Sequence, residues 1–189
     1  MSNIYYTPQL LIDACFDKIV RPLDGGKWLE PAAGDGRIAQ TMRLHAGESA
    51  LIHAIEIESQ ADSAIMDMRG ASLWSMRNFL DDTAIVDEKL YYDRIITNPP
   101  YSRAEEYIKK CLDLRASNGQ LVLLLRLAFL ESQKRYEELW RHDAYLPSRV
   151  WVLPKRPSFD GLGTDSTAYA WFEWTSDKRR NPEIRWLVW

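Results

Sequence analysis

The stretch Asp93–Tyr101, which reads DRIITNPPY, joins a short apolar run to two consecutive prolines. The apolar and β-branched residues of 93–97 are typical of a buried parallel strand. Pro99 and Pro100 lack backbone donors and cannot continue a helix, so the strand has to end there with the nearby carbonyl groups unpaired. The sequence therefore predicts a strand whose carboxyl end presents the Asn98 amide, free carbonyl groups and the Tyr101 ring.

These groups together suit the binding of a planar amino group. The Asn98 side-chain oxygen and the Pro99 carbonyl oxygen can accept hydrogen bonds from an NH2 group, while Tyr101 stacks on the ring or plane that carries it. We therefore predict that Asn98, Pro99 and Tyr101 are catalytic residues acting on an exocyclic amine or a carboxamide.

Strand patterns alternate with helical patterns along the chain. We predict strands over residues 27–30, 51–56, 72–76, 93–97, 120–126, 149–153 and 167–174, and leave a further strand over 184–188 open. We predict helices over residues 7–20, 37–46, 60–68, 103–116 and 131–142, with Thr7 capping the first and Pro8 at its first helical position. This alternation predicts an α/β, Rossmann-like, doubly wound and mostly parallel sheet of seven strands with an antiparallel closing strand.

The length, hydropathy and net charge of the chain limit the classes of protein to which it can belong. At 189 residues and 22.0 kDa, the chain is expected to form one domain over 1–189. No apolar run approaches the roughly 20 residues that span a bilayer, and the N-terminus lacks the pattern of a signal peptide. We therefore expect a cytoplasmic protein with no membrane partner. The net charge of −3 does not predict nucleic-acid binding, which would need a local basic patch.

A glycine loop follows the first predicted strand. In the stretch Glu30–Arg37, EPAAGDGR, Gly34 and Gly36 allow positive φ and a tight turn around a ligand. Glu56 ends the next strand, where nucleotide-binding sheets place an acidic residue on ribose hydroxyls. The Glu30 carboxylate would repel the phosphates of NAD but can hold an ammonium group. This charge pattern favours S-adenosylmethionine, which has an ammonium and a sulfonium group and no phosphate.

The motifs together resemble those of the amino-methyltransferases, which use S-adenosylmethionine. Tyr6-Thr7-Pro8 is similar to motif X, Glu30–Gly36 to motif I, Glu56-Ile57 to motif II, Asn78-Phe79-Leu80 to motif III and Asn98–Tyr101 to motif IV. This order is that of the γ-group of DNA adenine-N6 methyltransferases, and the resemblance covers nearly the whole chain. It implies the class I methyltransferase fold and no metal.

The resemblance also implies roles for individual residues. The implied cofactor-binding residues are Tyr6, Thr7, Glu30, Pro31, Ala32, Gly34, Gly36, Glu56, Ile57, Asn78, Phe79 and Asn98. Among them, Thr7 and Glu30 would contact the methionine end and Glu56 the ribose, with Ile57 and Phe79 on the adenine faces. Where the family usually has Asp, this chain has Asn78, which can accept through its carbonyl oxygen; alternatively Asp81 or Asp82 takes that role.

On the target side, the expected substrate is adenine in DNA, flipped out of the duplex and methylated at N6. The implied substrate-binding residues are Pro100, Tyr101, Arg103 and Phe159, the last in a loop where the family places an aromatic motif. The γ-group normally has a separate target-recognition domain, whereas only about 15 residues follow Trp174 here. The resemblance is thus to a small phage or bacterial type, and a protein partner could supply target recognition.

Three other interpretations of the function stay open. The substrate could be adenine in RNA, or a protein glutamine, because both use the same amino-group site. Alternatively the chain could be a non-catalytic, methyltransferase-like binding subunit.

Overall fold

A computed structural model describes residues 6–57, 70–81, 91–159, 163–177 and 181–189. Its strands are β1 (Lys27–Glu30), β2 (Leu51–Glu56), β3 (Leu73–Met76), β4 (Tyr92–Thr97), β5 (Arg115–Arg126), β6 (Arg149–Val152), β7 (Tyr169–Trp174) and β8 (Glu183–Trp186). Its α-helices are α1 (Gln9–Lys18), α2 (Arg37–Ala46), α4 (Ala104–Leu114) and the short α5 (Gln133–Arg135). Tighter or wider helical turns are η1 (Tyr101–Arg103), η2 (Leu127–Leu130) and η3 (Tyr136–Trp140).

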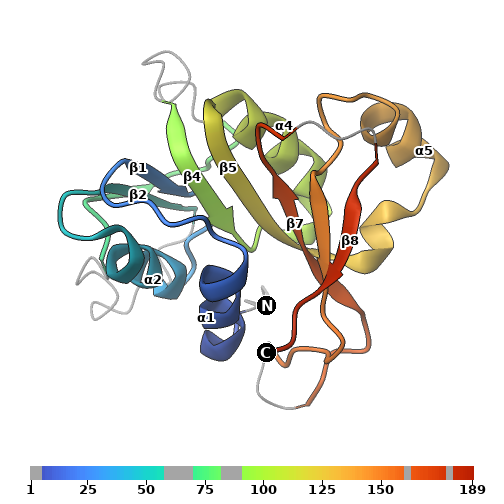
Figure 1. Cartoon of the computed structure of the whole chain (residues 1–189), viewed down its shortest axis with the longest axis horizontal. Coiled ribbons are helices and arrows are strands. Elements are labelled where there is room, and N and C mark those ends of the chain that lie inside the picture. Colours follow the sequence, from blue (N-terminus) through green and yellow to red (C-terminus); the bar gives the residue numbers. More distant parts are fainter. Residues whose placement is uncertain (1–5, 58–69, 82–90, 160–162, 178–180) are drawn as a thin grey trace.

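The strands form one sheet in the order β3-β2-β1-β4-β5-β7-β6-β8 (Figure 1). Strands β3, β2, β1, β4 and β5 pair in parallel, and β7 runs antiparallel to both of its neighbours. The predicted α/β sheet, mostly parallel with an antiparallel closing strand, is therefore confirmed. The structure adds an eighth strand to the seven predicted, because β8 pairs in parallel with β6 at the edge of the sheet.

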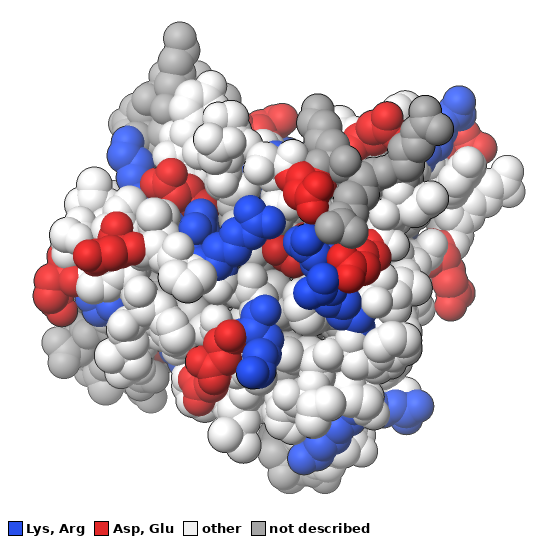
Figure 2. Space-filling model, viewed as in Figure 1, with Lys and Arg blue, Asp and Glu red and all other residues white. Residues whose placement is uncertain are grey.

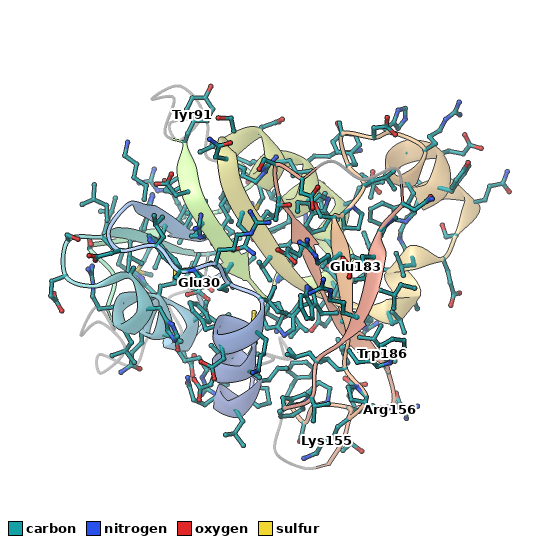
Figure 3. The ribbon with its side chains drawn as sticks, viewed as in Figure 1. Glu30, Tyr91, Lys155, Arg156, Glu183 and Trp186 are labelled. Atoms are coloured by element: carbon teal, nitrogen blue, oxygen red, sulfur yellow. The ribbon has the colours of Figure 1, made fainter. Side chains whose placement is uncertain are left out.

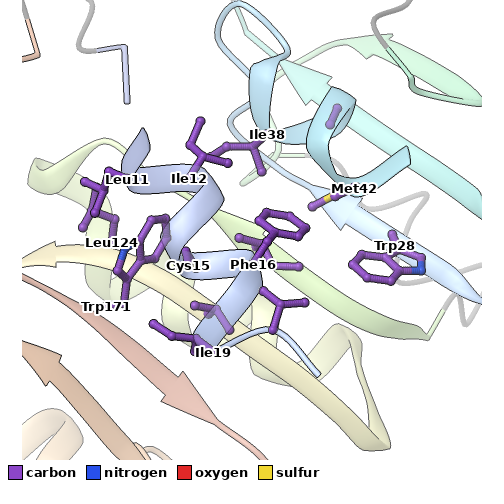
Figure 4. Packing of buried hydrophobic residues seen from close by; sticks show 14 of the residues in the cluster. Leu11, Ile12, Cys15, Phe16, Ile19, Trp28, Ile38, Met42, Leu124 and Trp171 are labelled. Atoms are coloured by element: carbon purple, nitrogen blue, oxygen red, sulfur yellow. The ribbon is translucent and has the colours of Figure 1, made fainter. Parts of the chain in front are cut away.

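Helices cover both faces of the sheet, so its central strands are buried on two sides. On one face, α1 and α2 pack against the sheet, and Figure 4 shows Leu11 of α1 beside Leu124 and Trp171 of β5 and β7, with Ile12 of α1 toward Ile38 of α2. On the other face, α4 and η3 cover a second cluster that includes Ile95, Leu123 and Phe172. This double cover explains why residues 121–125 of β5 read as a continuous apolar run.

The start of α1 differs from the prediction. Helix α1 begins at Gln9, and its first backbone donors, the N–H groups of Leu11 and Ile12, bond to the Pro8 carbonyl at 3.0 and 3.2 Å. Pro8 is therefore the capping residue, and Thr7 makes no capping bond. The prediction that Thr7 caps this helix was wrong because Thr7 lies one residue too early, and its hydroxyl is used elsewhere.

The single helix predicted over residues 131–142 is not formed in the structure. The chain instead forms α5 and the π-helical turn η3, preceded by η2. Ser132 takes a φ of 94° and accepts a hydrogen bond from the Arg135 backbone N–H, so a new helical start is forced there. The helix predicted over 60–68 lies outside the described residues. Within the described part of the chain, no helix has both the length and the apolar character needed to cross a membrane.

Leu124→Ala tests the packing between α1 and the sheet. Leu124 is fully buried, so we expect the free energy of unfolding to fall by about 2–5 kcal/mol, measured by urea denaturation. Leu44→Ala is the matched control, because the Leu44 side chain is 79% exposed and its loss should change stability by less than about 0.5 kcal/mol. Equal effects of the two variants would contradict this account of the core.

Candidate cofactor and amino-group site

The predicted site residues gather where β1, β2 and β4 end. A pocket at this edge of the sheet is lined by Tyr6, Thr7, Glu30, Ala32, Ala33, Gly34, Asp35, Arg37, Ile38 and Asn98. Six of these were predicted from the sequence: Tyr6, Thr7, Glu30, Ala32, Gly34 and Asn98. Parallel pairing causes this convergence, because β1 lies between β2 and β4 and all three strands end on the same side. Figure 3 labels Glu30 at the end of β1.

The glycine loop between β1 and α2 has the expected backbone. Gly34 and Gly36 have φ values of 54° and 78°, in the region that glycine occupies without a steric penalty. The loop is tied to the sheet by the Ala33 N–H, which donates to the Ile55 carbonyl at 2.9 Å. The Tyr6 ring lies over Gly34, where a methyl group would meet it at 3.9 Å. The loop is therefore tightly turned and open to a ligand along its backbone.

Glu30 is a carboxyl group buried without full hydrogen bonding. Its side chain is 1% exposed, and its Oε2 atom has no hydrogen-bond partner among the residues that the structure describes. Burial raises the pKa of Glu30 well above its ordinary value; a backbone hydrogen bond at Ala39 lowers it, and the charges of Asp35 and Glu56 raise it further. An unpaired buried carboxylate is costly unless a cation joins it. This oxygen therefore fits an ammonium group of a ligand in the pocket.

Glu56 reaches from the end of β2 to the glycine loop. Its Oε2 atom accepts a hydrogen bond from the Gly34 N–H at 2.6 Å, and its Oε1 atom accepts one from the Ile57 N–H at 2.8 Å. The Ile57 side chain beside it is 59% exposed. The structure thus places an acidic group and an exposed apolar side chain together beside the loop.

The predicted cofactor residues Asn78 and Phe79 do not line the pocket, and neither do Glu56 and Ile57. The Asn78 Oδ1 atom accepts from the Leu80 N–H at 3.1 Å, and the Asn78 Nδ2 atom donates to the Asp81 Oδ2 atom at 2.6 Å. Asn78 therefore shapes a local turn. Phe79 is 1% exposed, with its ring 5.2 Å from the Tyr107 ring of α4. Phe79 is covered by α4 and does not reach the described pocket, where it was expected to contact a ligand. Asp82, the alternative to Asn78, lies outside the described residues.

Asn98 follows β4 and faces the segment before α1. Its Nδ2 atom donates to the Thr7 Oγ1 atom at 3.1 Å. Its Oδ1 atom is buried and, within the described ranges, has no hydrogen-bond partner. Nearly all buried polar side chains in proteins are hydrogen-bonded, so an orphaned oxygen lining a pocket marks a place for a donor from a ligand. The amide thus has one end held by the protein and the other available to an amino group.

Tyr101, in η1, is more enclosed than the sequence suggested. Its ring lies 5.5 Å from the Tyr169 ring, and the Arg126 guanidinium lies 5.1 Å from the ring centre. Burial raises the pKa of the Tyr101 hydroxyl, as does the nearby Tyr169, whereas the Asn98 side chain and Arg126 lower it. The hydroxyl is buried and makes no hydrogen bond of ordinary geometry with the described residues. The hydroxyl therefore stays protonated and can act as a hydrogen-bond donor at neutral pH.

Of the three remaining substrate-side residues, Pro100 is exposed, and Phe159 and Arg103 are engaged with the protein. Phe159 is buried, with its ring 5.0 Å from the Tyr169 ring. Arg103 is exposed and its Nη2 atom lies 2.6 Å from the Glu106 Oε2 atom. Tyr101, Tyr169 and Phe159 thus form a continuous aromatic cluster beside the Asn98 end of β4. Tyr169 was not predicted as a site residue, since its place in a strand pattern indicates core.

Asp35 and Arg37 also line the pocket and were not predicted as site residues. Arg37 forms hydrogen bonds through Nε to both Asp35 oxygens and through Nη1 to the Thr7 carbonyl, the last at 3.0 Å. The signal in the sequence is an acidic and a basic residue two positions apart inside a glycine loop. Among the described residues, no three His, Cys, Asp or Glu side chains are grouped so that they could hold a metal ion.

No family model matches this chain, and no curated protein matches it in sequence. Solved structures match it in fold. A methyltransferase subunit of a type I restriction-modification system from Streptococcus thermophilus has a TM-score of 0.74 at 14% identity, covering 97% of this chain and 46% of that chain. A precorrin-6y C5,15-methyltransferase from Geobacter metallireducens has a TM-score of 0.65 at 17% identity, covering 93% of both chains. The chain has the class I methyltransferase fold.

A third similar structure is the M protein of the type I restriction enzyme EcoKI, with a TM-score of 0.70 at 14% identity. The match covers 97% of this chain and 48% of that protein. The chain thus spans just under half the length of the type I methyltransferase subunits that it matches.

The raised pKa of Glu30 predicts a distinct pH dependence of stability. The folded protein holds the Glu30 proton more tightly than the unfolded chain, in which a glutamate has a pKa of about 4.3. The stability linked to Glu30 is therefore fully present below that pH and is lost as the pH rises through the raised pKa. We expect Glu30→Gln to gain stability over the wild type toward neutral pH, measured by urea denaturation across pH.

The exposed Glu48 provides the control. Glu48→Gln should follow the wild-type pH profile. A Glu30→Gln profile parallel to that of the wild type would show that Glu30 ionises in the folded protein as easily as in the unfolded chain.

Proposed function

We propose that this protein is an S-adenosylmethionine-dependent methyltransferase that acts on an exocyclic amino group, namely N6 of adenine in DNA. One observation carries the proposal. The buried Asn98 Oδ1 atom has no partner in the described part of the chain, and it lines the same pocket as the unpaired carboxyl oxygen of Glu30. The pocket thus combines an acceptor for an amino group with a carboxylate for an ammonium group.

The cofactor would be held by the loop between β1 and α2. Glu30 can pair with its ammonium group, Glu56 can accept from its ribose hydroxyls, and Ile57 is exposed beside Glu56 to contact its adenine ring. Bound S-adenosylmethionine would supply an activated methyl group on its sulfonium sulfur. The positive φ values of Gly34 and Gly36 let the loop turn tightly around such a ligand.

The protein's part in the chemistry is to orient an amino group. The Asn98 Oδ1 atom and the Pro99 carbonyl accept the two N–H bonds, which draws the nitrogen lone pair out of conjugation with the ring. No described His, Cys or carboxylate group is needed as a base, because the product nitrogen is cationic and releases its proton readily. Catalysis then rests on positioning and on fixed dipoles.

Two observations support DNA as the substrate. Similar structures include methyltransferase subunits of type I restriction-modification enzymes, which act on DNA. In addition, Lys155 and Arg156 follow β6 at the same edge of the sheet as Asn98 and are exposed. Figure 3 labels them at the lower right of the molecule, and in Figure 2 no acidic atoms of described residues adjoin the basic atoms there. Such a local patch can contact phosphates although the chain is acidic overall.

Target recognition could need a second protein. The chain covers just under half of each similar type I methyltransferase subunit. We propose that a partner supplies sequence recognition while this chain supplies the cofactor and amino-group sites.

Methyl transfer tests the activity directly. Isotope-labelled S-adenosylmethionine is offered with unmethylated DNA, total RNA or protein extract, and the labelled product is identified by mass spectrometry after hydrolysis. We expect N6-methyladenine from DNA, with the rate reduced by roughly 100-fold or more in Asn98→Ala because a preorganised hydrogen bond to the reacting group is lost. Asn118→Ala, at the exposed amino end of β5, is the matched control and should retain the wild-type rate.

Label in RNA or in glutamine alone would retain the amino-group chemistry and overturn DNA as the substrate. Measurable cofactor binding without label in any polymer would indicate a binding subunit or a missing partner. Equal rates for Asn98→Ala and the wild type would refute the catalytic role of Asn98.

The basic patch can be tested through salt dependence. Replacing Lys155 and Arg156 together by Gln should weaken DNA binding and make the plot of log affinity against log salt shallower by about one unit per lost phosphate contact. Lys18 and Lys27 are exposed at the opposite edge of the sheet, so their double replacement by Gln is the charge-matched control. Equal slopes for both double variants would remove Lys155 and Arg156 from the DNA interface.

A further inference from the structure

The segment before α1 contacts the acceptor side chain directly. The Thr7 side chain is buried, and its Oγ1 atom accepts the hydrogen bond from the Asn98 Nδ2 atom at 3.1 Å. Because Pro8 caps α1, the Thr7 hydroxyl is not needed for the helix. These two residues lie 91 positions apart, so only the folded chain brings them together.

Thr7 is itself held by the glycine loop. The Arg37 Nη1 atom donates to the Thr7 carbonyl at 3.0 Å, and the same guanidinium pairs with both Asp35 oxygens. The Arg37 guanidinium also lies 5.5 Å from the centre of the Tyr6 ring. A continuous series of contacts therefore leads from Asp35 in the loop through Arg37 and Thr7 to Asn98.

We propose that Thr7 is a positioning residue that holds the Asn98 amide in place, and that Arg37 locks Thr7 to the cofactor loop. The role of Asn98 as acceptor belongs to the proposed function, on which this inference rests. The contact between Thr7 and Asn98 joins two side chains of this chain, so it can also be tested without activity.

The orientation of the amide matters because its two ends are chemically opposite. With Oδ1 toward the pocket, Asn98 accepts from an amino group; rotated by half a turn, it would present N–H groups to N–H groups. Oδ1 is the atom without a partner among described residues, and Nδ2 is the atom bonded to Thr7. A hydroxyl can accept or donate, so the Thr7 contact fixes where the amide lies; in this arrangement it accepts from Nδ2, and Oδ1 is left toward the pocket.

The contact series also joins the two halves of the site. Asp35 and Arg37 belong to the loop that would surround the cofactor, whereas Asn98 would bind the amino group. A loop held by Arg37 keeps Thr7, and through it Asn98, at a fixed place relative to the cofactor. Positioning of this kind affects the chemical step more than the binding of either ligand alone.

The first test follows the Asn98 side-chain amide in the ligand-free protein. Its N–H resonances are identified by their loss in Asn98→Ala, and their hydrogen exchange is then compared among variants. In Thr7→Val, which keeps the shape but removes the acceptor, exchange should be faster and the resonances should shift. In Thr7→Ser, which keeps the hydroxyl, both should resemble the wild type. Unchanged exchange in Thr7→Val would overturn the proposal, whatever the protein methylates.

The second test separates positioning from cofactor binding. The resemblance implied that Thr7 contacts the methionine end of the cofactor, but its Oγ1 atom is bonded to Asn98 instead. We therefore expect Thr7→Val to lower kcat for methyl transfer by roughly 10- to 100-fold, with the Kd for S-adenosylmethionine, measured by calorimetry, within about twofold of the wild type. Thr7→Ser should recover most of the lost rate, and Arg37→Gln should lower kcat in the same direction as Thr7→Val.

Thr175→Val is the matched control for packing. Thr175 is also a buried threonine, with its Oγ1 atom 3.1 Å from the Ser148 Oγ atom, but it follows β7 at the opposite edge of the sheet. Its replacement should lower stability and leave kcat unchanged. Equal losses of kcat in Thr7→Val and Thr175→Val, or a large rise in cofactor Kd in Thr7→Val alone, would overturn the positioning role. Absence of methyl transfer by the wild type would instead refute the proposed function and leave the exchange test decisive.

Discussion

The parallel pairing of β1 with β4 is the constraint on which the site depends. Trp28 pairs with Arg94 and Leu29 with Ile95, so the two strands run side by side and end at the same edge. Glu30 and Asn98 are therefore brought to one pocket although the intervening chain contains β2 and β3. Burial of both sheet faces supplies the driving force, because the apolar side chains of the central strands are removed from water on both sides.

The site is also where the structure leaves hydrogen bonds unmade. Within the described residues, the unpartnered buried side-chain atoms include Glu30 Oε2, Asn98 Oδ1 and the Tyr101 hydroxyl oxygen. Each such group lowers the stability of the folded chain, and the two packed clusters on either face of the sheet offset that loss. Glu30 and Asn98 line one pocket, and Tyr101 follows Asn98 by three positions. A ligand with matching donors and a positive charge would restore the missing interactions.

Local patterns predicted much of this molecule. The bounds of β1, α2 and β2 agree with the residues predicted, since apolar alternation and glycine turns are short-range signals. Residues 131–142 were predicted less well, because the positive φ at Ser132 and the π-helical turn have no clear signature in residue order. Phe79 and Phe159 look alike as loop aromatics in the sequence, yet both are buried against other rings.

The sequence alone determined that a strand ends at Asn98, that a glycine loop follows Glu30, and that strands alternate with helices. These features depend on backbone donors, on φ and on hydrophobic periodicity, which are properties of neighbouring residues. Only the tertiary structure decided which partners the polar groups take. Thr7 could cap a helix, but it holds Asn98 because folding brings the start of the chain against the end of β4. Arg37 likewise joins the loop to Thr7, a contact set by packing across 30 positions of sequence.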